Sequence, residues 1–111
     1  MESLIEEIIY DLTIELSGDA GFSADILRQK VKNAAREVRL HRNYGATSMD
    51  EAAIASDMQK FYSVIRNVAL YDYNQVGIEF QLIHTENGVT RNYEDRNRML
   101  AGVVPFAKVV V

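Results

Sequence analysis

Apolar side chains recur at intervals of three and four residues in three stretches of the first 75 residues. This spacing places them along one side of an α-helix, as a face that must be covered. The stripes begin at Leu4, Leu27 and Ile54. The clearest of them consists of Ile54, Met58, Phe61, Ile65 and Val68. Three such faces predict a helical bundle around one shared core.

The limits of the three helices are predicted from the residues at their ends. The first, 3–16, is followed by a Ser-Gly-Asp stop signal. The second, 23–42, begins at a serine N-cap and ends at an Asn/Gly-rich stretch. The third is predicted as one continuous helix over 48–75. It opens on a capping box in which Ser48 is the N-cap and Glu51 stands three residues later.

The pattern changes to a period of two at Ile78, which is typical of a strand. Asn87-Gly88 then supplies the two residues that a type I′ hairpin turn requires. We therefore expect a single domain, 1–111, made of a helical body (1–77), a β-hairpin (78–94), and a short helix with a C-terminal tail (95–111). The predicted fold class is mainly α: a three-helix bundle plus a short fourth helix, with a C-terminal hairpin and an extended tail.

Several classes of function find no support in the sequence. The chain has no cysteine, which excludes a disulfide framework, a thiolate metal site and a cysteine nucleophile. Its two histidines, His41 and His84, lie on different predicted elements, and no phosphate-binding glycine loop or nucleophile elbow is present. We expect no enzymatic activity, no metal and no cofactor.

Two further features bear on location. The longest apolar run, 103–111, is interrupted by Lys108 and is too short to span a bilayer. The first residues are acidic, whereas a secretion signal begins with positive charge. We therefore expect no membrane association and a cytoplasmic location.

The net charge of −4 is unevenly distributed. Residues 1–21 carry six acids and no Lys or Arg, whereas residues 22–45 carry six bases and two acids. Opposite charges on two elements can pair within one chain or between neighbouring copies, and both readings remain open. The candidate subunit-interface residues are Glu6, Asp11, Glu15, Arg28, Lys32, Arg36 and Arg39.

The basic second helix also allows an alternative function, a small helical DNA-binding regulatory protein. Its cations, which are able to contact phosphates, are Arg28, Lys30, Lys32, Arg36, Arg39 and Arg42. A dedicated DNA-binding domain is usually strongly basic, whereas this chain is acidic overall. We therefore favour a solvated face, or one that meets an acidic surface.

Residues 84–93, HTENGVTRNY, and 100–109, LAGVVPFAKV, resemble the end of small tailed-phage head–tail connector proteins, also described as head-completion, adaptor or DNA-packaging proteins. In that family a segment like S-E-x-G-x-S-R-x-Y precedes a tail like P-x-A-K-V. The positions that fit are Glu86, Gly88, Arg91 and Tyr93, while Thr85 and Thr90 replace serines. Ala34-Ala35 also resembles an alanine pair in the family's second helix.

The resemblance implies a structural subunit of a phage or prophage. Such subunits form a homo-oligomeric ring of about a dozen copies beneath the portal, between the DNA-filled head and the tail. The implied partners are the portal protein and a stopper or tail-completion protein, and DNA passes through the channel without sequence-specific binding. The implied location is the host cytoplasm during virion assembly, and then the virion neck.

The C-terminal tail is the segment expected to bind the partner. Its candidate residues are Phe106, Lys108, Val109, Val110 and Val111. A β-prone free end can add as a strand to the edge of a partner's sheet, where backbone hydrogen bonds supply affinity. Pairing of the tail with this chain's own hairpin and a frayed tail are the other readings, and they also remain open.

Overall fold

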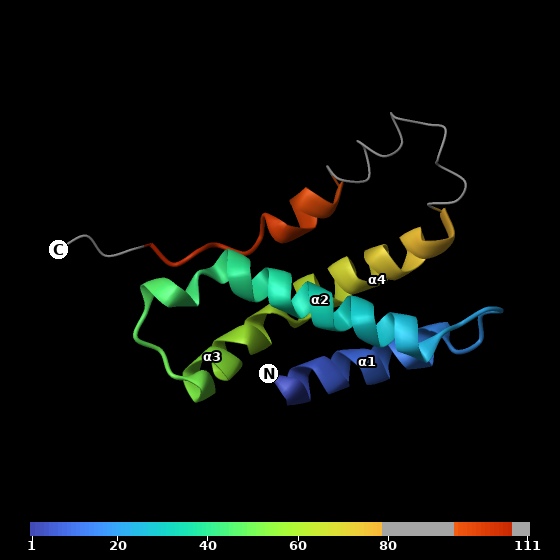
Figure 1. Ribbon diagram of the computed structural model, residues 1–111, viewed down its shortest axis with the longest axis horizontal. Helices are drawn as coiled ribbons and strands as arrows, with labels where there is room; N and C mark the ends of the chain where they lie inside the picture. Colours follow the sequence, from blue (N-terminus) through green and yellow to red (C-terminus); the bar gives the residue numbers. More distant parts are fainter. Residues whose placement is uncertain (79–94, 108–111) are drawn as a thin grey trace.

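The computed structural model describes residues 1–78 and 95–107, and these are mainly helical (Figure 1). The helices are α1 (Glu2–Leu16), α2 (Ala24–Arg42), α3 (Glu51–Met58) and α4 (Tyr62–Ile78), with 3₁₀ turns at Tyr44–Ala46 and Gln59–Phe61 and a short helix at 95–100. No strand occurs within these two ranges. The predicted hairpin lies outside the described residues except for Ile78, which is the last residue of α4.

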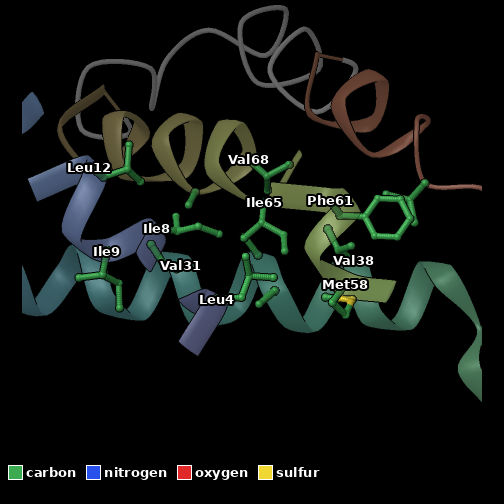
Figure 2. Packing of buried hydrophobic residues seen from close by; sticks show 14 of the residues in the cluster. Leu4, Ile8, Ile9, Leu12, Val31, Val38, Met58, Phe61, Ile65 and Val68 are labelled. Carbon is green, nitrogen blue, oxygen red and sulfur yellow. The ribbon is translucent and has the colours of Figure 1, made fainter. Parts of the chain in front are cut away.

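The central element is α2, which packs against both α1 and α4 and runs antiparallel to α1 (Figure 1). Side chains from these helices meet in one core, where Leu4, Val31 and Ile65 are fully buried (Figure 2). Every member of the clearest predicted stripe is buried, and so are the stripes that begin at Leu4 and Leu27. The predicted helical core is therefore confirmed.

Both predicted ends of α2 are also confirmed. The Ser23 hydroxyl oxygen accepts a hydrogen bond from the Ile26 N–H (3.3 Å), as an N-cap does. The Ser23 N–H in turn donates to the Tyr73 hydroxyl (3.1 Å), which ties the start of α2 to α4. At the other end Asn43 takes a left-handed conformation (φ 61°), which asparagine tolerates better than most residues.

The prediction of one continuous helix over 48–75 is wrong, because the 3₁₀ turn Gln59–Phe61 separates α3 from α4. The apolar stripe gives no sign of this break. Residues three apart align in a 3₁₀ turn and nearly align in an α-helix, so Met58 and Phe61 stay on the same face in either case. Among the residues described, the bundle therefore has four principal helices rather than the three that the sequence predicts.

The predicted capping box is wrong as well. Asp50 is the N-cap of α3, and its carboxylate accepts a hydrogen bond from the Ala53 N–H (2.8 Å). Ser48 lies two residues before this cap and is exposed. The Glu51 carboxylate, which a capping box would direct to the backbone, instead binds Arg39 of α2.

The last described segment returns to the helical body. The 95–100 helix and residues 103–107 run toward the C-terminal end of α2 (Figure 1). Leu100 and Val103 are buried, and Phe106 packs against the core while half-buried. The predicted short helix near 95–101 is confirmed, and Val103, which follows it, belongs to the core.

Candidate functional site

Arg42, the last residue of α2, connects the helical body to the C-terminal segment. Its Nε donates to Asp57 Oδ2 (2.9 Å) and its Nη2 to Asp57 Oδ1 (3.3 Å). Its Nη1 donates to the backbone carbonyl of Val104 (2.6 Å). The guanidinium carbon also lies 3.8 Å from the centre of the Phe106 ring, within cation–π range. One cation thereby joins α2, α3 and the C-terminal segment.

Phe106 is fixed from three further directions. Its N–H donates to the Arg42 carbonyl (2.9 Å), which is one of the carbonyls left unpaired at a helix end. Its own carbonyl accepts from Asn43 Nδ2 (3.1 Å), and its ring packs against Tyr44 with the centroids 5.8 Å apart. We call the contacts of Arg42, Asn43 and Tyr44 with Val104 and Phe106 the C-terminal anchor.

A buried carboxylate, Asp57, organises the base of this anchor. Besides Arg42, it accepts hydrogen bonds from the Tyr44 hydroxyl (2.6 Å) and faces Lys60 Nζ (3.2 Å). The hydrogen bonds from Arg42 hold the pKa of Asp57 well below its usual range, against the opposing effect of burial. Burial and the bond to Asp57 raise the pKa of Tyr44. The carboxylate therefore stays ionised and the phenol protonated near neutral pH.

Arg96 attaches the 95–100 helix in a similar way. Its guanidinium donates to both Asp72 oxygens of α4 (2.8 and 2.9 Å) and to Glu37 Oε1 of α2 (2.6 Å). The hydrogen bond to Asp72 is the main cause, ahead of the one to Glu37, of a raised pKa for Arg96. Its side chain is 20% exposed, so these charge-assisted bonds are partly shielded from water. The segment that ends in the anchor is thus held at both of its ends.

Sequence reasoning did not identify these two clusters. For Arg42 and Asp57 one signal was available: Asp57 lies between Ile54 and Phe61, at helical spacing from both, inside the clearest apolar stripe. An acid in that position is buried and requires a cationic partner. The sequence does not show which of the six cations on the second helix supplies it. For Arg96 no comparable signal exists.

Most of the candidate subunit-interface residues have partners within the chain. Glu6 binds Arg28, and Arg28 in turn lowers the pKa of Glu6. Asp11 accepts from the Tyr62 hydroxyl, and this bond raises the pKa of Tyr62 to about 12. The remaining intrachain pairs are Glu15 with Arg66 and Arg39 with Glu51. Of the two readings of the charge asymmetry, pairing within the chain accounts for these residues.

Lys32 and Arg36 differ from the other candidates. Both are exposed, and neither forms an ion pair with the residues that the structure describes. With Met1, Glu2 and Ile5 they line a shallow groove of about 230 Å³ between α1 and α2. Among the predicted tail residues, Phe106 lies in the C-terminal anchor, and residues 108–111 lie outside the described part of the chain.

The described ranges contain no group of three or more His, Asp or Glu side chains placed to hold a metal ion. None of the helices described is both long and apolar enough to cross a membrane. Comparison with models of protein families, with curated proteins and with solved structures finds no match for this chain. The function has therefore to be inferred from the chain's own residues.

Proposed function

We propose that this protein is a structural, non-enzymatic subunit of a tailed-phage or prophage head–tail connector. In this role it assembles into a ring beneath the portal and joins the DNA-filled head to the tail. The resemblance of residues 84–93 and 100–109 to such proteins supports the proposal. The observation that carries it is the C-terminal anchor, which holds Phe106 against the end of α2 directly before the candidate tail residues.

The anchor matters because a short peptide loses conformational entropy when it binds a partner. Fixing Val104 and Phe106 to α2 restricts where the next residues begin, before any partner is present. A β-prone end that starts from a rigid base suits the addition of a strand to a partner's sheet. The function proposed for residues 108–111 is therefore to bind the portal protein, with the anchor as their fixed base.

This proposal is tested by binding to a cognate portal, followed by negative-stain microscopy and co-sedimentation. We expect the full chain to bind as a ring beneath the portal. A variant that ends at Ala107 keeps every residue of the anchor and serves as the matched comparison. This variant should remain folded but no longer bind the portal. The proposal is contradicted if the full chain does not bind the portal, or if the 1–107 variant binds it as well as the full chain does.

The alternative of a DNA-binding regulator is weakened by the ion pairs of α2. Arg28, Arg39 and Arg42 are bound to carboxylates of the same chain and would have to exchange them for phosphates. Lys32 and Arg36 are the exposed exceptions. A gel-shift series across salt concentration, with Lys32→Ala/Arg36→Ala, decides this point. Tight binding that the double substitution abolishes would favour the regulator.

A further inference from the structure

One side of α1 carries apolar and acidic side chains exposed to solvent. Tyr10 is 67% exposed and Ile14 62% exposed, and the two lie one helical turn apart, so that they form one exposed apolar patch rather than isolated side chains. Glu7 is also exposed and forms no ion pair with the residues described. Spacings of three and four residues place Glu7, Tyr10 and Ile14 on one side of the helix. We call these three residues the acidic face.

One exposed side of α2, which borders the groove with α1, carries the complementary combination. Leu40 is 78% exposed, the largest value among the exposed apolar side chains of the described residues. Arg36 and Lys32 precede it at intervals of four residues, and both are exposed. We call Lys32, Arg36 and Leu40 the basic face. Each face thus pairs large exposed apolar groups with charge of one sign.

The exposed apolar residues of the two faces are too far apart to meet within one chain. Helices α1 and α2 are antiparallel (Figure 1), and Glu6 of α1 binds Arg28 of α2. The residues of α1 that follow Glu6 by a turn or more, Tyr10 and Ile14 among them, therefore lie near the start of α2 or beyond it. Leu40 is sixteen residues further along α2. At about 1.5 Å of rise per residue, this separation is about 24 Å. Tyr10 and Ile14 therefore cannot be covered by Leu40 of the same chain, and these apolar side chains need a partner from outside it.

We propose that the partner of each face is a second copy of this chain, with the acidic face of one copy docked on the basic face of the next. Opposite charges favour this contact, whereas acidic-to-acidic and basic-to-basic contacts are repulsive. When the acidic face of one copy binds the basic face of the next, the pair still has one free acidic face and one free basic face. Further copies can bind there, and the series of contacts can close into a ring. The inference rests on the proposed function for the biological purpose of this assembly. It keeps Lys32 and Arg36 from the candidate interface residues and replaces the five that are paired within the chain with Glu7, Tyr10, Ile14 and Leu40.

The absence of cysteine from the chain allows the contact to be trapped even when it is weak. Ile14→Cys and Leu40→Cys are combined in one chain, and the purified protein is oxidised. The two thiols cannot bond within a chain, because a disulfide requires Cα atoms less than about 7 Å apart. We expect a ladder of dimers, trimers and larger disulfide-linked species on a non-reducing gel, reversed by a reductant.

The matched control places the second cysteine on an exposed position outside both faces, as Ile14→Cys/Ser56→Cys. A ladder no stronger than that of the control overturns the inference. So does a product that stops at the dimer, since this indicates a two-fold contact rather than a head-to-tail one. Circular dichroism of the reduced proteins confirms that each variant keeps its helices.

The charge part of the inference has its own test in the same double-cysteine protein. Glu7→Lys or Arg36→Glu should each slow the formation of the ladder roughly three- to tenfold at low salt, and the two together should restore much of the rate. Unchanged rates contradict the charge argument. Portal binding is measured separately. A ladder without portal binding supports this contact between copies and contradicts the proposed connector function. Portal binding without a ladder contradicts this contact alone.

Discussion

Arg42, the last residue of α2, makes an ion pair with the buried carboxylate of Asp57, a hydrogen bond to the backbone carbonyl of Val104 and a ring contact with Phe106. The pair is well shielded, with the Asp57 side chain 7% exposed and that of Arg42 15% exposed. Removing one partner from such a pair leaves the other charge buried without compensation, which is strongly destabilising. At the residue scale the fold is therefore most sensitive at this pair.

We predict that Asp57→Asn lowers the free energy of unfolding at neutral pH by about 3 kcal/mol. The folded-state pKa of Asp57 is depressed, so its stabilising contribution is complete above the unfolded-state pKa, near 4, and is lost as the pH falls further. The variant should accordingly lose less stability between pH 5 and pH 2 than the parent does, as measured by urea unfolding at several pH values. The exposed Asp19→Asn is the control. Parallel pH profiles for parent and variant would show that Asp57 is not held ionised.

We predict that Arg42→Lys releases the C-terminal segment although it keeps the charge. A lysine retains one contact to Asp57 but loses the bidentate geometry, the bond to the Val104 carbonyl and the flat stack on Phe106. The amide of Phe106, which is bonded to the Arg42 carbonyl, should exchange with solvent at least about tenfold faster, equivalent to about 1.4 kcal/mol. Hydrogen exchange followed by NMR measures this. If the exchange rate of the Phe106 amide is unchanged, the anchor depends on its backbone hydrogen bonds and not on the Arg42 side chain.

At the scale of elements, the 95–100 helix depends on contacts with other helices, since six residues are too few for a stable isolated helix. Arg96 connects it to α4 and α2, and Leu100 packs in the core. We predict that Arg96→Met lowers the free energy of unfolding by about 2 kcal/mol and increases proteolysis within this helix. Arg98 lies in the same helix, and its side chain is 79% exposed. Arg98→Met should therefore change the free energy of unfolding by no more than about 0.5 kcal/mol and leave the rate of proteolysis unchanged. Equal effects of the two substitutions would show that the ion pairs of Arg96 do not hold this helix in place.

At the scale of the whole molecule, the division between body and tail falls later in the chain than the sequence indicates. Phe106, a candidate partner-binding residue of the tail, packs against the body. We predict that a chain ending at Ala107 keeps its melting temperature within about 2 °C. A chain ending at Gly102 removes the buried Val103 and the anchor and should lose at least about 2 kcal/mol, roughly 8 °C or more. Calorimetry of the two truncations is the measurement, and similar melting temperatures would contradict the structural role of 103–107.

Local patterns in the sequence are enough to predict the helical body. Apolar spacing is a property of neighbouring residues, so the stripes that begin at Leu4, Leu27 and Ile54 were sufficient to predict the three buried faces, and Ser23 to predict the start of α2. The break between α3 and α4 was not predictable in this way. A 3₁₀ turn at Gln59–Phe61 preserves the same three-residue spacing that a continuous helix has.

The pairing of the charges and the docking of the last described residues, by contrast, follow from tertiary packing. Arg42 and Val104 are 62 residues apart in sequence, and Arg96 and Glu37 are 59 apart. No local pattern selects one cation among many for one buried acid, because the choice depends on which helix faces are covered after the core has packed. The same packing uses most of the charges that first indicated a subunit interface, and leaves Glu7, Lys32 and Arg36 exposed beside Tyr10, Ile14 and Leu40.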